Sequence, residues 1–289
     1  SIYSEEQAQV TREWNEKIEV ANEEIKSFFE FSRLPTSVVE VQSLNITVIN
    51  GQNHRGSTWN IGNQLIGKLG EGHQVTEFFL ARDMPHACIG CFTCFLKGEE
   101  FCPHHELMAP IITALDSADL IVLTSPVYVM GVSGAMKNVL DHLGWRWMVH
   151  RPNQVFFRKQ GVVIATSAGA LTRTTLNGMA DSLKFWGVPI IHRIGIAVNE
   201  LNWDKVKPGI KKRIDRKTTR TAKAILRHDG KAHATLFQKG LFLGMRMINK
   251  KGWNEKDTAY WRERGWLNGK YPWKQQGSAT HLMKKSKFN

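Results

Sequence analysis

The stretch that decides the fold is Leu44-Asn-Ile-Thr-Val-Ile-Asn50, followed directly by Gly51-Gln-Asn-His-Arg-Gly-Ser-Thr58. The first part is rich in apolar and β-branched residues, which predicts a strand. The second part is polar and contains glycine at both ends of its first six positions, which predicts a turn. Apolar residues then recur at helical spacing from Ile61 to Leu69. A strand, a glycine-containing turn and a helix in this order form the first half of a nucleotide-binding βαβ unit.

Further strand patterns follow along the chain, with helical patterns between them. We expect strands at 73–81, 118–124, 161–166 and 189–198, and helices at 106–115, 134–143 and 171–186. Residues 118–124 are apolar almost throughout, as expected of a parallel strand that is buried on both faces. Five strands that alternate with helices predict an open α/β sheet with right-handed crossovers.

The sequence on either side of this pattern has a different character, and we divide the chain into 1–43, 44–200 and 201–289. Residues 4–32 carry apolar positions at helical spacing among many charges, which predicts one or two amphipathic helices. After Glu200 we expect a basic helix over 205–227, an apolar-rich helix over 232–249 and an aromatic cluster at 260–266. We interpret 201–289 as a helical extension that packs on the core.

The net charge of +13 is concentrated at the C-terminal end. Residues 203–289 hold 23 Lys and Arg against 6 Asp and Glu, a balance of +17, whereas residues 1–202 hold 16 against 20, a balance of −4. This asymmetry indicates an anionic partner such as a nucleotide phosphate, a membrane surface, nucleic acid or an acidic protein; the alternative is a solvated cationic surface. Nucleic acid is disfavoured, because Lys211-Lys-Arg213 and Lys284-Lys285 lack interleaved aromatic residues for base stacking.

Composition also bears on the location of the protein. Apolar residues make up 42% and charged residues 22% of the chain, as in ordinary globular proteins. We find no run of about 18 uncharged apolar residues, which a membrane-spanning helix would need. The polar, acidic stretch Ser1–Glu6 does not have the pattern of a signal peptide. We therefore expect a cytoplasmic protein.

The turn after the first strand is a candidate anion site. Backbone amides at a helix N-terminus favour an anion, and Ser57 and Thr58 add hydroxyl donors while His54 and Arg55 add basic side chains. The turn contains neither the dinucleotide-binding glycine pattern nor a P-loop. The structural alternative is that the Ser-Thr pair simply caps the following helix.

Three loops carry a resemblance to a known family. Gly51-Gln-Asn-His-Arg-Gly-Ser-Thr-Trp59 resembles the phosphate loop of the NADPH-dependent FMN reductase family, which has a flavodoxin-like fold. Thr124-Ser-Pro-Val-Tyr-Val-Met-Gly131, followed by Gly134-Ala-Met-Lys-Asn-Val-Leu-Asp141, is similar to that family's Pro-x-Tyr loop and the helix after it. Thr166-Ser-Ala-Gly-Ala170 resembles its third flavin loop. The resemblance covers roughly residues 44–198.

The resemblance implies a doubly wound five-stranded parallel sheet in the order 2-1-3-4-5, with FMN bound at the ends of its strands. The FMN phosphate would lie on the first loop and the flavin ring on the other two. The residues implied are Gln52, Asn53, His54, Gly56, Ser57, Thr58 and Trp59 for the phosphate, and Pro126, Val127, Tyr128, Val129, Ser167, Ala168 and Gly169 for the ring.

The family also implies an activity. Electrons would pass from NADPH, NADH or a donor protein through FMN to a quinone, a free flavin, another small organic acceptor or a cluster. We can name no catalytic acid or base from the sequence. Relatives of this kind are usually dimers or tetramers, so we expect a homo-oligomer. A non-enzymatic electron carrier is the alternative function.

All four cysteines fall in one loop, Cys88-x2-Cys91-x2-Cys94-x7-Cys102-Pro103. Such clustering argues against structural disulfides, which usually join distant segments. The spacing resembles the motif of iron–sulfur flavoproteins, which implies a 4Fe–4S cluster on these four thiolates. Two alternatives remain open. One is a zinc ion that takes all four thiolates, or uses His104 or His105 in place of one of them. The other is a metal-free loop of reduced or redox-active thiols.

Overall fold

The computed structural model describes residues 16–17, 19–20, 23, 43–169 and 171–274. The chain divides into two units, residues 1–42 and 43–289. In the larger unit five parallel strands form one sheet in the order β2-β1-β3-β4-β5. The strands are β1 (Asn45–Asn50), β2 (Gln74–Phe79), β3 (Leu120–Pro126), β4 (Gln160–Ser167) and β5 (Ile190–Ala197). This arrangement confirms the expected flavodoxin-like fold.

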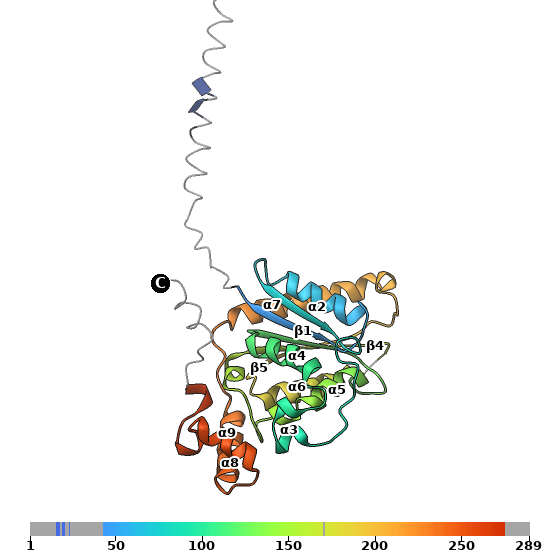
Figure 1. Ribbon diagram of the computed structural model, residues 1–289. Helices are drawn as coiled ribbons and strands as arrows, with labels where there is room; N and C mark the ends of the chain where they lie inside the picture. Colours follow the sequence, from blue (N-terminus) through green and yellow to red (C-terminus); the bar gives the residue numbers. More distant parts are fainter. Residues whose placement is uncertain (1–15, 18, 21–22, 24–42, 170, 275–289) are drawn as a thin grey trace, which may run out of the picture. The chain divides into compact units, whose positions relative to one another are not determined.

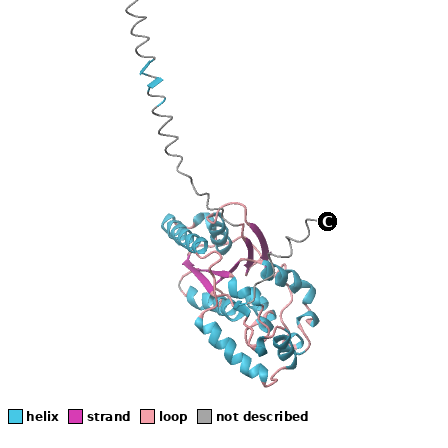
Figure 2. Cartoon of the chain, turned by 90° about the vertical axis from the view of Figure 1, so that its left-hand side faces the viewer, coloured by secondary structure: helices cyan, strands magenta, loops and turns pink. Residues whose placement is uncertain are grey.

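Helices cover both faces of the sheet (Figures 1 and 2). The α-helices are α2 (Ser57–Gly67), α3 (Thr93–Leu96), α4 (His105–Ser117), α5 (Gly134–His142), α6 (Thr172–Trp186), α7 (Pro208–Arg227), α8 (Leu236–Lys250) and α9 (Glu255–Glu263). Short 3₁₀ helices lie at Glu99–Phe101, Gly144–Arg146, Gln154–Arg158, Trp203–Lys205, Trp266–Asn268 and Pro272–Lys274. α2 and α7 lie on one face, and α4, α5 and α6 lie on the other (Figure 1).

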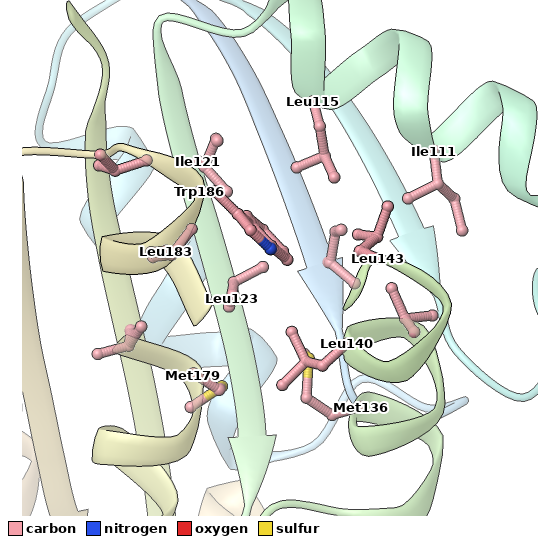
Figure 3. Packing of buried hydrophobic residues seen from close by; sticks show 14 of the residues in the cluster. Ile111, Leu115, Ile121, Leu123, Met136, Leu140, Leu143, Met179, Leu183 and Trp186 are labelled. Atoms are coloured by element: carbon pink, nitrogen blue, oxygen red, sulfur yellow. The ribbon is translucent and has the colours of Figure 1, made fainter. Parts of the chain in front are cut away.

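Alternation along the central strands explains the two layers. In β3, Ile121 and Leu123 pack with α4, α5 and α6, whereas Leu120 and Val122 pack with α2 and α7. Successive strand residues point to opposite faces, so a strand buried on both sides must be apolar throughout. Figure 3 shows Trp186 from α6 lying over β3 among the leucine and methionine side chains of this layer.

The C-terminal region adds helices to this core. α7 packs along α2 through Ile214, Ala222 and Ile225 in the same apolar cluster. A separate aromatic cluster includes the fully buried Phe242, Trp261 and Trp266. The predicted helix over 232–249 begins only at residue 236, because the Thr235 side chain caps it in a reciprocal box with Gln238.

The boundaries that we expected at residues 43 and 200 stay a prediction. The predicted helices over 4–32 lie almost entirely outside the described residues; of that stretch, only residues 16, 17, 19, 20 and 23 are described, as exposed helix. None of the helices in the described part of the chain is long and apolar enough to cross a bilayer.

Candidate functional site

A cavity of about 330 Å³ opens at the carboxyl edge of the sheet. The register aligns Asn50 with Thr124, Pro126 with Thr166, and Ser167 with Ala197, so the loops after four strands meet there. Ligands bind at this edge in open α/β sheets, at the point where the strand order reverses. The cavity is lined by Gln52, His54, Gly56, Ser57, Pro126, Val127, Tyr128, Thr166, Ser167, Ala168, Val198, Asn199, Glu200 and Leu201.

The N-terminus of α2 lies at this cavity, and backbone N–H groups of its first turn have no partner within the helix. Gly56, not Ser57 or Thr58, is the N-cap residue, and no side chain caps the helix. The first helical hydrogen bond runs from the Asn60 amide to the Gly56 carbonyl, so the amides before residue 60 have no partner inside the helix. Thr58 is 1% exposed and its Oγ1 atom has no hydrogen-bond partner. The alternative that this Ser-Thr pair caps α2 is therefore wrong.

The turn itself is tightly packed. A Cβ atom on Gly56 would lie 2.6 Å from the Gln52 Nε2 atom, which donates to the His54 carbonyl at 3.2 Å. A Cβ atom on Gly51 would lie 2.8 Å from both the Ser133 Oγ atom and the Thr124 carbonyl oxygen. Side chains at either glycine would displace the backbone of the turn. The two glycines thus hold the turn close to the strand ends.

Trp59 lies apart from the cavity wall. Its Nε1 atom donates to the Glu77 carboxylate at 2.8 Å, and the Arg55 guanidinium lies 4.9 Å from the centre of its ring. Asn53 is exposed and Thr58 is buried, and neither lines the cavity. Of the seven residues expected to hold the phosphate, four line the cavity: Gln52, His54, Gly56 and Ser57.

The second loop is held against β4 and ends in a strained turn. The Val127 amide donates to the Thr166 carbonyl at 2.8 Å, and Tyr128 and Gly131 exchange two backbone hydrogen bonds. The residues between them, Val129 and Met130, have φ of +47° and +67°. A β-branched residue such as valine rarely adopts this conformation. Tyr128 is half exposed beside the cavity, whereas the Val129 side chain points fully into solvent and does not line it.

A fourth loop, which we did not predict from the sequence, completes the cavity. The Val198 amide donates to the Ser167 carbonyl at 2.9 Å, which places residues 198–201 beside the third loop. Ser167 and Ala168 line the cavity as expected, but Gly169 does not; the Ser167 hydroxyl donates to its carbonyl at 3.2 Å. The carboxyl ends of parallel strands share one edge, so the position of the loop after the fifth strand could have indicated its part in the cavity.

The four cysteines surround a second cavity of about 190 Å³, also lined by His104 and His142. All four thiols are free. Burial raises the pKa of Cys94 to about 11, and the nearby thiolates of Cys102 and Cys88 contribute to that rise. Hydrogen bonds from Thr93 lower the pKa of the exposed Cys91. The loop therefore brings the thiols close enough to repel one another when ionised.

The side chains of Asn138 and Arg151 position the cysteine loop. The Asn138 side chain accepts from the Cys88 amide at 2.7 Å and donates to the His86 carbonyl at 2.6 Å. Arg151 is 1% exposed and donates to the Cys94 carbonyl and, at 2.5 Å, to the Asp257 carboxylate on α9. The loop is thus held from α5 on one side and from the C-terminal region on the other.

A histidine from α5 joins the loop, which the sequence alone did not indicate. Ligand atoms of Cys102, His104 and His142 all lie within 4.8 Å of one another. The His142 Nδ1 atom lies 2.9 Å from the Asn138 carbonyl, which leaves its Nε2 atom facing His104 Nδ1 at 3.0 Å. Burial and the neighbouring His104 lower the pKa of His142. His105, one of the two histidines considered for zinc, instead contacts the Glu99 carbonyl.

Comparison with known proteins supplies the family. The sequence model described as NADPH-dependent FMN reductase matches residues 44–200. An iron–sulfur flavoprotein from Archaeoglobus fulgidus is 31% identical over 129 residues, 44% of this chain and 56% of the relative. Another from Methanocaldococcus jannaschii is 32% identical over 117 residues, 39% of this chain and 56% of the relative. The chain thus spans about half the length of these curated relatives.

The chain is also similar to solved structures, among them an azoreductase. The complex of an FMN-dependent NADH-azoreductase from Bacillus anthracis strain Ames Ancestor with FMN aligns at a TM-score of 0.48 and 13% identity. The alignment covers 61% of this chain and 99% of that one.

Proposed function

Because the chain belongs to the NADPH-dependent FMN reductase family, we propose that it is an FMN-dependent NAD(P)H oxidoreductase that passes electrons to a quinone, a flavin or another small organic acceptor. The observation that carries the proposal is the uncapped N-terminus of α2, where Ser57 lines the cavity and the adjacent, buried Thr58 hydroxyl has no hydrogen-bond partner. A buried hydroxyl without a partner costs free energy, so its retention is explained by a ligand that supplies one.

The residues around the cavity have distinct roles in this proposal. The α2 amides, Ser57 and Thr58 hold the FMN phosphate, because helix N-termini and hydroxyl donors favour an anion. Pro126 and Tyr128, together with the adjacent loop at 166–168, would line the flat ring. Bound FMN supplies the hydride and electron-transfer chemistry, while the protein supplies orientation and restricts access of water.

The first experiment uses the unmodified chain and measures FMN binding and NAD(P)H oxidation. We expect added FMN to bind with quenching of its fluorescence, and the loaded protein to oxidise NADH or NADPH when a quinone is present. FMN binding without NAD(P)H turnover would instead support the electron carrier. Failure to bind FMN would reject both functions.

Thr58→Val sharpens the test, since it removes only the hydroxyl. We expect FMN affinity to fall about tenfold or more, as for loss of a hydrogen bond to a charged group. The FMN-free variant should be no less stable than the parent, because the hydroxyl has no partner there. Thr47→Val is the matched control, since the buried Thr47 hydroxyl donates to the Ala114 carbonyl at 2.8 Å. It should lose stability and keep its FMN affinity. The opposite pattern would reject the assigned phosphate contact.

We also propose that Cys88, Cys91, Cys94 and Cys102 hold a 4Fe–4S cluster. The support is that all four line one cavity, while the compact group of ligand atoms within 4.8 Å contains only one of them. Four thiolates on one zinc ion would lie about 3.8 Å apart, given Zn–S bonds of about 2.3 Å in a tetrahedron. The four thiols do not form a group as compact as that, which favours a larger metal centre. A zinc ion would instead use Cys102, His104 and His142.

A homo-oligomer is part of the proposal, as expected from the resemblance. Its support is two fully exposed apolar side chains: Leu201, which lines the cavity, and Val129, which follows the lining residue Tyr128. A partner subunit would cover them and narrow the access of water to the ring. Sedimentation equilibrium of the FMN-loaded protein measures the assembly state.

A cytoplasmic location remains a proposal as well. So does a partner at the basic C-terminal region, either an acidic protein or an anionic surface.

A further inference from the structure

We propose that α8 docks the protein on the surface of an anionic lipid bilayer. The docking surface, the α8 face, consists of Leu236, Phe237, Leu243, Met247 and Ile248, together with Trp253 just after the helix. Their side chains are between 37% and 86% exposed. α8 lies at the outer margin of its unit, beyond α9 (Figure 1).

The α8 helix has one buried face and one exposed face. Its buried residues, Gln238, Phe242, Arg246 and Asn249, recur at helical spacing and form the side that packs on the protein. Phe242 belongs to the aromatic cluster, and Gln238 donates to the Val188 carbonyl at 3.0 Å. The α8 face lies on the opposite side. Packing therefore accounts for one side of α8 and leaves an exposed apolar surface on the other, which commonly marks an interaction site.

The positive charge around the α8 face favours an anionic partner. Between residues 235 and 253 there is no Asp or Glu, whereas Lys239, Lys250 and Lys251 follow the α8 face at spacings of three or four residues from Leu236 and Met247. The Lys184 Nζ atom lies 3.7 Å from the centre of the Phe237 ring. A second copy of this face would bring lysine against lysine without a carboxylate from α8 to pair with them. An anionic bilayer accepts both the lysines and the apolar side chains.

The dimensions fit a helix that lies in the interface. Fifteen residues make a helix about 22 Å long, too short to cross a hydrocarbon core of about 30 Å. Lys250, Lys251 and Trp253 sit at the C-terminal end of α8, and amphipathic side chains of these types prefer the headgroup level. Docking would also bring the neighbouring α9, which contacts the cysteine loop through Asn254 and the Phe95 carbonyl, toward the lipid.

The experiment is vesicle co-sedimentation of the full chain, loaded with FMN if it binds. We expect vesicles of phosphatidylcholine with phosphatidylglycerol to bind it at least about tenfold more strongly than pure phosphatidylcholine vesicles at about 0.1 M salt. Raising the salt to about 1 M shortens the Debye length from about 10 to about 3 Å and should weaken that binding. Equal binding to both kinds of vesicle, or binding to neither, would overturn the proposal.

The variants separate the α8 face from the rest of the basic surface. Leu243→Glu with Met247→Glu should lower binding to anionic vesicles about tenfold or more. Val75→Glu, at an exposed apolar position on the edge strand β2, should leave it unchanged. Lys250→Glu with Lys251→Glu tests the charges without touching the apolar side chains, and should also weaken binding. Circular dichroism checks that each variant is folded. A contrary result would be a parent that fails to bind vesicles and forms a dimer without lipid, which Leu243→Glu with Met247→Glu dissociates. That result would assign the α8 face to self-association and reject the membrane proposal.

Discussion

The most demanding prediction concerns Arg151, which joins three distant parts of the chain. Its guanidinium is 1% exposed and lies 2.5 Å from the Asp257 carboxylate, which is fully buried on α9. It also donates to the Cys94 carbonyl and lies 3.4 Å from the Glu99 carboxylate. We expect Arg151→Met to keep the apolar volume of the stem but to leave the Asp257 carboxylate buried with His150 as its remaining side-chain partner, at 2.7 Å.

The expected cost follows from that burial. Removing one partner of a buried ion pair destabilises a protein by about 3–5 kcal/mol, because the other charge is left without compensation. That loss is a large part of the about 5–15 kcal/mol by which proteins are usually stable. Urea unfolding, followed by circular dichroism, measures the difference. Arg151→Met combined with Asp257→Asn removes both charges, so its cost should fall short of the sum of the single variants by about 1–3 kcal/mol.

The control is an ion pair of the same kind on the surface. Lys137 and Asp141 are one helical turn apart on α5, and their side chains are 60% and 45% exposed. Exposed pairs of this type contribute about 0.3–0.5 kcal/mol, so Lys137→Met should change stability very little. If Arg151→Met costs no more than Lys137→Met, or if the double variant shows simple additivity, the buried network does not hold the C-terminal region in place.

Two other predictions concern the metal loop and the pH dependence of stability. In anaerobically purified protein, Cys91→Ser should lower bound iron and sulfide while His142→Asn keeps them; loss of zinc in the His142 variant alone would favour the mononuclear alternative. Burial lowers the pKa of Lys159 from 10.5 to about 8, mainly by desolvation, so the folded state releases this proton at lower pH than the unfolded state. The free energy of unfolding of the parent, relative to that of Lys159→Met, should therefore rise between about pH 8 and 10.5 by up to about 3 kcal/mol. Urea titrations at each pH measure this difference. A difference that stays flat or falls with pH would show that the amine is not desolvated in solution.

The order of the secondary-structure elements could be predicted from the sequence. Apolar runs and helical spacing are local properties, so they placed every strand of the sheet and most helices within a few residues. The cysteine spacing and the turn after the first strand are equally local, because each is contained in one short segment. Together with the family resemblance, they located the two candidate sites before any tertiary contact was known.

Tertiary structure decided which atoms are free and which are paired. Ser57 and Thr58 have the residue types of helix caps, and only the observed N-cap at Gly56 showed that they leave α2 uncapped. His142 reaches Cys102 from a different helix, and Arg151 meets Asp257 across 106 positions of sequence. Such contacts depend on how whole helices and loops pack against one another. A short-range sequence pattern does not show which residues far apart in the chain will meet. The sequence therefore determined the sheet and its loops, while packing determined which side chains face the cavities at their ends.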